Sequence, residues 1–293
     1  MLSKYIEKIL RKTPEIYRGK AVGIGWRATQ KAENQIFISE ILNIVSKLPI
    51  SIKVYTDSNI KSFPFTERVE FIQTCDPEKY LVEGLYQGSI DYAIRGNLSA
   101  KDIKINIEDC FGIKIHRAVY IEENSHKDDR LRFFLAPVGI DELQTNTEKL
   151  EFIKSFTGFF DIFKLNKKIL LLGSGRKEDI GRSKKVDDIF KDVSELEDMI
   201  RLNYPSIDVY NVGICIEKAK IIKPGLIIPY DGITGNIIYR TLILFSNNSF
   251  KAFGAPVIPA EICFIDTSRE KKDIYRAFYM ALYLIAKRNS CLN

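Results

Sequence analysis

In the stretch LIIPYDGITGNIIYRTLILF, residues 226–245, an apolar run ends at Pro229 and a second apolar run with helical spacing begins a few residues later. Asp231, Gly235 and Asn236 stand between the two runs. A short apolar run followed by a helical one is typical of an α/β protein, whose sheets bind ligands at the carboxyl ends of their strands. The stretch therefore predicts a strand, a ligand-facing loop and a helix that opens at Gly235. The alternatives are that Asp231 is an Asx-turn acid and that Asn236 caps the helix.

Outside this stretch, short apolar runs alternate with longer amphipathic segments from end to end. Strands are predicted at 20–26, 50–56, 68–74, 89–96, 117–123, 131–139, 167–173, 207–213, 225–232, 250–258 and 261–267. Further helices are predicted at 30–47, 76–88, 146–165, 186–203 and 270–288. This alternation predicts parallel sheets that are covered by helices.

Composition and charge narrow the class of protein. The 293 residues are 45% hydrophobic and 28% charged, which is ordinary for a globular protein and enough for one large domain or two moderate ones. The net charge is +6, but no block of five like charges occurs, so nucleic-acid binding is not indicated. The longest apolar run, 277–286, is too short to span a bilayer. We therefore expect a soluble, cytoplasmic protein with no membrane partner.

Cysteines and histidines are too few and too scattered for several kinds of site. None of the five cysteines forms a CxxC pair, and the sequence has two histidines. A zinc site, a disulfide framework and a Ser-His-Asp triad are therefore not expected. Most of the cysteines stand in or beside apolar segments and are expected to be small buried hydrophobes; these are Cys75, Cys110, Cys215 and Cys263.

The loop GSGRKEDIGR, residues 173–182, has a composition that suits an anion. Gly173 and Gly175 allow a tight turn and close approach of backbone N–H groups to a ligand. Arg176 and Arg182 add positive charge with bidentate geometry. The alternative is a plain strand-to-helix turn whose charges are solvated, and the loop sequence leaves both open.

The segment DTSREKKDIYRAF, residues 266–278, follows a predicted strand and leads into the last predicted helix. Arg269 would clamp a phosphate, and the Ser268 hydroxyl would hydrogen-bond a reacting carbonyl. Asp273 would act as a general base if it is desolvated. The alternatives are that Ser268 caps the helix and that Asp273 is a favourable charge in its first turn.

Taken together, these motifs resemble a known family. IIPYDGITGNIIYRTL resembles the signature of phosphotransacetylases and phosphotransbutyrylases, TSR resembles their Ser-Arg pair before the final helix, and GSIDYAIRGNLSA resembles a third segment. Over nearly the whole chain, the sequence is similar to the methanogen family named methyltransferase Mtx subunit X, or methanogenesis marker family. The segment from FFLAPVG to LLGSGRKEDIGR carries this closer match. That family is a divergent relative of the phosphate acyltransferases.

The resemblance implies a fold with two α/β/α lobes, like that of isocitrate and isopropylmalate dehydrogenases, with the active site in a cleft between them. Lobe one would comprise residues 1–140 plus 246–293, and lobe two residues 141–245. Family members usually dimerise, so a homodimer is expected. Their reaction moves an acyl group between phosphate and coenzyme A, which implies no bound cofactor and coenzyme A as a candidate cosubstrate.

The resemblance also implies roles for particular residues. In the first lobe Ser268 and Arg269 match the Ser-Arg pair, Ser99 falls near the phosphate, and Asp273 is the candidate base. In the second lobe Asp231, Gly235 and Asn236 match the ligand-facing loop. Arg176 is a further candidate for binding the ligand, and Arg95 and Arg117 are candidates for phosphate binding.

Three functions are therefore expected, in this order. The first is a phosphate acyltransferase-like enzyme that uses a small phosphate-containing ligand and a thiol. The second is a methyltransferase, or a subunit that partners a methyltransferase or a corrinoid protein, although the sequence has no DxHxxG corrinoid motif. The third is a non-catalytic protein that binds a phosphate ligand.

Overall fold

The computed structural model describes residues 14–59, 66–125, 129–268 and 274–290. The chain divides into two compact units, of which unit 1 comprises Met1–Ile115, Phe253–Val257 and Glu261–Asn293, and unit 2 comprises His116–Ala252 and Ile258–Ala260. The predicted lobes differ from these units in residues 116–140, 246–252 and 258–260, which belong to unit 2. The strands at Val119–Glu123, Arg132–Leu135 and Phe250–Ala252 pair in the sheet of that unit.

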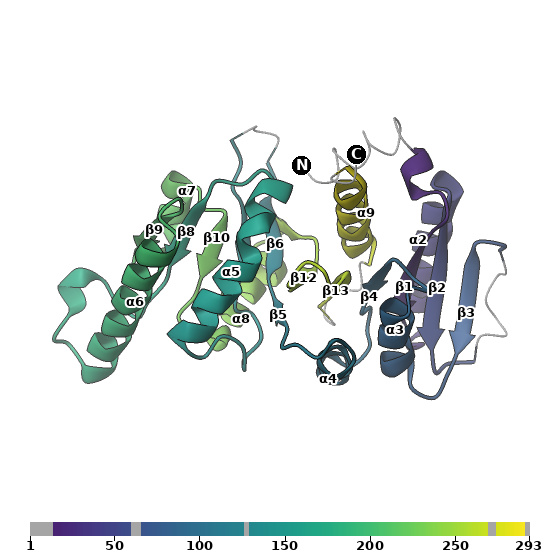
Figure 1. The fold of residues 1–293 in the computed structure, drawn as a ribbon, viewed down its shortest axis with the longest axis horizontal. Helices are drawn as coiled ribbons and strands as arrows, with labels where there is room; N and C mark the ends of the chain where they lie inside the picture. Colours follow the sequence, from purple (N-terminus) through teal and green to yellow (C-terminus); the bar gives the residue numbers. More distant parts are fainter. Residues whose placement is uncertain (1–13, 60–65, 126–128, 269–273, 291–293) are drawn as a thin grey trace. The chain divides into compact units, whose positions relative to one another are not determined.

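Within unit 1 the strands follow the order β3-β2-β1-β4-β13-β12 (Figure 1). They are β1 (Lys20–Gly25), β2 (Ile50–Thr56), β3 (Val69–Gln73), β4 (Tyr92–Ile94), β12 (Ala255–Ile258) and β13 (Phe264–Asp266). The strands from β3 to β13 pair in parallel, whereas β12 is antiparallel to β13. In β1, the buried Ile24 pairs with Val54 of β2 and Ile94 of β4, so β1 lies inside the sheet rather than at its edge.

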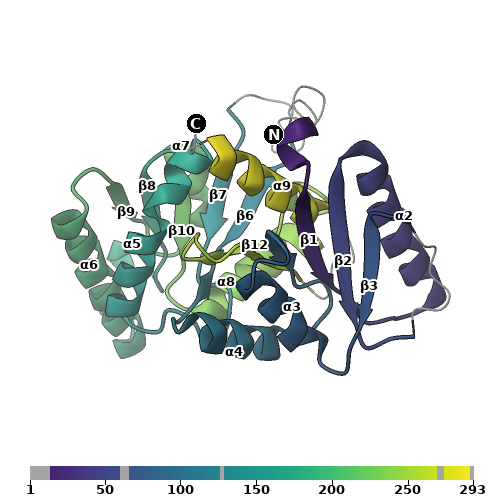
Figure 2. The same cartoon turned by 45° about the vertical axis from the view of Figure 1, so that its right-hand side comes forward.

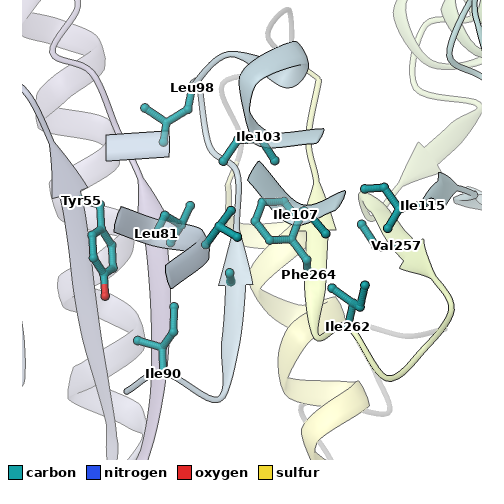
Figure 3. Packing of buried hydrophobic residues seen from close by; sticks show 12 residues of the cluster. Tyr55, Leu81, Ile90, Leu98, Ile103, Ile107, Ile115, Val257, Ile262 and Phe264 are labelled. Carbon is teal, nitrogen blue, oxygen red and sulfur yellow. The ribbon is translucent and has the colours of Figure 1, made fainter. Parts of the chain in front are cut away.

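Helices α2 (Lys31–Lys47), α3 (Pro77–Tyr86), α4 (Ala100–Phe111) and α9 (Tyr275–Ser290) belong to unit 1. A core cluster joins α3 and α4 to the sheet, with Leu81, Ile107 and Phe264 among its buried members (Figure 3). The helix starts follow from the sequence. Asp76, for example, caps α3 by accepting from the Lys79 amide at 3.1 Å.

The sheet of unit 2 runs in the order β11-β6-β7-β10-β8-β9. Its strands are β6 (Val119–Glu123), β7 (Arg132–Leu135), β8 (Lys168–Leu171), β9 (Asp208–Asn211), β10 (Leu226–Ile228) and β11 (Phe250–Ala252). Helices α5 (Asn146–Ile162) and α6 (Lys184–Asn203) pack side by side (Figures 1 and 2). A capping box of Thr145 and Glu148 fixes the start of α5, and α8 (Gly232–Arg240) passes into a π-helical turn at Thr241–Phe245.

The prediction of parallel sheets is wrong for part of each sheet. Strands β7, β10, β8 and β9 pair in parallel, but β6 is antiparallel to both β7 and β11. The predicted strand 250–258 is also wrong as one element, because it forms β11 in one sheet and β12 in the other. Gly254, with φ +96°, lies between them and permits the turn.

Two smaller expectations also change. The helix expected from Gly235 begins at Gly232, one residue after its Asp231 cap. Cys215 and Cys263 are buried as expected, but Cys75 is exposed and Cys110 is half-buried. Within the described part of the chain, every helix is too short or too polar to cross a membrane.

Candidate functional site

In unit 1 the candidate residues gather where β1, β4 and β13 end. These strands are linked by parallel pairing, so their carboxyl ends lie at one edge of the sheet. Gly96 follows β4 with φ +64°, and a Cβ on it would lie 1.8 Å from the carbonyl oxygen of Gly25. Only glycine fits this contact, which brings the exits of β1 and β4 together.

Two contacts hold the residues that follow β13 against those that follow β4. The Thr267 hydroxyl donates to the Gly96 carbonyl at 2.6 Å, and the buried Arg95 pairs with Asp266. Arg95 also donates to the Leu98 carbonyl at 2.6 Å. Arg95 was a candidate for phosphate binding on the basis of the sequence. In the structure its guanidinium binds partners within the fold instead.

Ser268 stands directly after this fastened segment and is half-buried. Among the described residues, no hydrogen bond engages its hydroxyl. The alternative that Ser268 caps the last helix is wrong, because α9 begins at Tyr275. Arg269 and Asp273 lie outside the described residues, so their roles stay predictions.

Ser99 lies at the same edge and has a structural role. Its hydroxyl caps α4 by accepting from the Asp102 amide at 3.3 Å, and its own amide donates to Glu78 at 2.9 Å. Its predicted contact with a phosphate stays a prediction.

Arg27 is a residue of this edge that the sequence reasoning missed. It follows β1, donates to both carboxylate oxygens of the buried Glu78 at 2.6 and 3.0 Å, and donates to Asp57 at 2.8 Å. Burial alone would lower the pKa of Arg27, but the hydrogen bonds to Asp57 and Glu78 outweigh it and raise the pKa above its ordinary value. The sequence signal that could have identified Arg27 is its position as a charged residue immediately after the apolar run KAVGIGW.

In unit 2 the candidate loop packs against the segment that follows β7. Asp231 caps α8 by accepting from the Thr234 amide at 2.7 Å, three residues on, so it is a helix cap rather than the acid of an Asx-turn. The half-buried Asn236 side chain donates to the Val138 carbonyl at 3.0 Å, so it ties α8 to the exit of β7 rather than capping the helix. A Cβ on Gly235 would lie 1.8 Å from the Pro137 carbonyl oxygen, which makes this glycine a packing requirement.

Arg117 and Arg176, two further candidates for binding the ligand, also lie in unit 2. Arg117 donates to the buried Glu142 at 2.6 Å, which is a contact within the fold. Arg176 is exposed on the loop after β8. A hydrogen bond to Cys215 is the main cause that raises the pKa of Arg176 above its ordinary value. An exposed arginine on this loop agrees with the alternative of a turn whose charges are solvated.

Lys149 of α5 is a second residue that the sequence reasoning missed. Its Nζ donates to the Tyr230 carbonyl at 2.7 Å and lies 5.0 Å from the centre of the Tyr230 ring. Lys149 is only 3% exposed. Burial is the main cause that lowers its pKa below 10.5, and the charges of Asp192, Asp231 and Glu148 only partly oppose the shift.

A pH dependence of stability follows from Lys149. The unfolded chain has its lysine at the ordinary pKa of 10.5, so between the lowered folded value and 10.5 the unfolded state binds more protons than the folded state. Wild type should therefore gain stability relative to Lys149→Met as the pH rises through this window. Urea unfolding of both proteins from neutral to alkaline pH measures the difference, and a difference that is constant or falls with pH would contradict the prediction.

The candidate residues thus form one set in each unit. Ser99 and Ser268 share the edge of the unit 1 sheet. The second set lies in unit 2. Asp231, Gly235 and Asn236 follow β10, and Arg176 follows the neighbouring strand β8. The expectation that both sets face one ligand stays a prediction.

Proteins of similar sequence occur in methanogens. The chain is 31% identical over 219 residues to an "Uncharacterized methyltransferase" of Methanocaldococcus jannaschii, an alignment that covers 72% of the chain and 84% of the relative. It is 33% identical over 215 residues to the "Putative methyltransferase mtx subunit X" of Methanosarcina barkeri, covering 73% of the chain and 76% of the relative. No family model matches the chain.

Solved structures with a similar fold include phosphotransacylases. A branched-chain phosphotransacylase from Enterococcus faecalis superposes with a TM-score of 0.67 at 14% identity, covering 91% of this chain and 99% of the other. A phosphotransacetylase from Streptococcus pyogenes gives a TM-score of 0.58 at 15% identity, covering 97% and 98%. The prediction of a phosphotransacetylase-like α/β fold is confirmed.

Proposed function

The chain belongs to the methanogen family of methyltransferase Mtx subunit X, and we propose that it is a transferase that moves an acyl-type group between phosphate and a thiol such as coenzyme A. The observation that carries this proposal is the position of Ser268. Its half-buried hydroxyl is unengaged among the described residues and follows a segment that Thr267 and Asp266 fasten to β4. A fold like that of phosphotransacylases supports the same chemistry.

The reaction needs a thiolate, an acyl phosphate and stabilisation of charge on the carbonyl oxygen. The thiolate sulfur attacks the acyl carbon, the C–S bond forms, and the bond from that carbon to the phosphate oxygen breaks, so phosphate leaves with the electron pair. Ser268 donates a hydrogen bond to the oxygen on which negative charge develops. In this proposal Arg269 holds the phosphate and Asp273 accepts the thiol proton, as the family resemblance implies.

Exchange of labelled phosphate into acetyl, propionyl or butyryl phosphate in the presence of coenzyme A tests this function. Ser268→Ala should lower the exchange rate by about 10²- to 10³-fold, as loss of one oxyanion donor does in other enzymes. Ser183→Ala is the matched control and should leave the rate unchanged. Ser183 caps α6 in unit 2 through the Val186 amide, at 3.3 Å. Absence of exchange with all three acyl phosphates, or equal rates for wild type and Ser268→Ala, would refute the proposal.

A second function, methyl transfer, is favoured by the names of the relatives. In this case the protein would act together with a methyltransferase or a corrinoid protein. Transfer of a labelled methyl group from a methylcorrinoid protein to a thiol tests it. Methyl transfer without phosphate exchange would favour this function, and tight binding of inorganic phosphate without either reaction would indicate a ligand-binding protein.

A further inference from the structure

We propose that Lys149 is a positioning residue that holds the turn between β10 and α8 in the shape that presents Asp231 and Asn236. The effect on turnover rests on the proposed function, whereas the effect on the turn does not. This turn, residues 229–232, carries the cap of α8 and begins the helix that bears Asn236. Lys149 reaches it from α5, and its partner Tyr230 lies 81 positions later in the sequence.

Lys149 contacts the backbone of the turn directly. The Lys149 ammonium donates to the carbonyl of Tyr230, the residue immediately before Asp231. A charge-assisted hydrogen bond of 2.7 Å from a side chain that is only 3% exposed fixes the orientation of that peptide group. The direction in which the chain enters Asp231 is thereby fixed as well.

Tyr230 is also held through its side chain. Its ring covers the ammonium, and its hydroxyl donates to Asp192 of α6 at 3.1 Å. Asn146, the first residue of α5, donates to the Asp192 carbonyl at 2.8 Å. The turn is therefore held by both α5 and α6, and Lys149 is the charged group that joins it to α5.

Stability alone does not explain a lysine at this position. Burial costs the charged form free energy, and no carboxylate of the described residues lies within ion-pair distance of Lys149. A methionine of similar length would avoid that cost. Lys149 lowers stability but fixes the backbone of a candidate site. Its presence is therefore better explained by a role in positioning that backbone.

Hydrogen exchange of the turn amides tests the proposal without any assumption about the reaction. The Thr234 amide is protected by the Asp231 carboxylate, and the Gly235 amide by the Asp231 carbonyl. In Lys149→Met both amides should exchange about tenfold faster or more, while amides in β8 should not change. Lys154→Met is the matched control, because Lys154 lies on the exposed face of the same helix. Lys149→Arg, which keeps the charge, should restore part of the protection.

Equal exchange of these two amides in wild type, Lys149→Met and Lys154→Met would overturn the proposal. If Lys149→Met does not fold, Lys149→Gln takes its place, and both amides should again exchange faster than in wild type because the shorter, neutral side chain does not reproduce the charged contact with the Tyr230 carbonyl. Protection in Lys149→Gln equal to that in wild type would likewise overturn the proposal.

The phosphate exchange assay separates this inference from the proposed function. If wild type exchanges phosphate, Lys149→Met should lower kcat/KM about tenfold or more, and Lys149→Arg should recover part of it. If wild type has no exchange activity, the proposed function fails, and the amide exchange still decides whether Lys149 positions the turn.

Discussion

Gly235→Ala is expected to destabilise unit 2 by about 3 kcal/mol or more, because the new Cβ would meet backbone rather than a movable side chain. It would lie 1.8 Å from the Pro137 carbonyl oxygen and 3.3 Å from the Pro229 ring. Pro137 closely follows β7, which pairs with β6 and β10, so the contact has little freedom to open. Urea unfolding followed by far-UV circular dichroism measures the change.

Gly158→Ala is the matched control for this prediction. Gly158 lies on the exposed side of α5, and a Cβ there would have nothing within 4 Å. Alanine is the better helix former, so this variant should be more stable than wild type by about 0.5–1 kcal/mol. A Gly235→Ala protein as stable as wild type would show that α8 does not press against the exit of β7.

Gly235 also illustrates what the sequence could and could not predict. Its position between a strand and a helix was visible from the periodicity of residues 226–245, and the same stretch supported the family and the fold. The glycine was expected to open the helix beside a ligand. In the structure it lies inside the first turn of α8 and against Pro137, and the pairing of β7 with β10 brings these distant segments together.

The same limit applies to the charged residues. Lys149 stood within a predicted amphipathic helix, where a lysine is ordinarily solvated, and nothing local indicated that it would be buried against Tyr230. Arg95 and Arg117 were recognised as candidate phosphate ligands, but their carboxylate partners come from distant segments. Periodicity predicts which face of an element is buried, whereas the pairing of charges depends on which elements become neighbours.

The direction of strand pairing was the least predictable part of the fold. Apolar runs of similar length formed both parallel and antiparallel strands, because the antiparallel strands β6 and β12 are as buried as the parallel strands of the same sheets. The split of 250–258 into two strands depended on one residue, Gly254, whose positive φ cannot be read from the sequence.

Asp266→Ala is expected to destabilise unit 1 by about 3–5 kcal/mol, because it leaves the charge of Arg95 buried without its carboxylate. The Arg95 side chain is 4% exposed and that of Asp266 13%. Lys167→Ala is the matched control, since it breaks an exposed pair with Asp161 and should cost about 0–1 kcal/mol. Urea unfolding of the single variants measures both changes.

The double variant Arg95→Met/Asp266→Ala distinguishes a buried charge from a general loss of packing. If the cost arises from the unpaired guanidinium, removing it should recover about 1–3 kcal/mol relative to the sum of the single changes. Strict additivity would contradict this account. If the protein carries out the proposed phosphate exchange, the double variant should remain below wild type in that assay, because the Asp266 carboxylate also accepts from the Thr267 amide at 2.8 Å and so shapes the backbone that leads to Ser268. Recovered stability without recovered exchange would separate the role of the pair in folding from its role in holding Ser268 at the edge of the sheet.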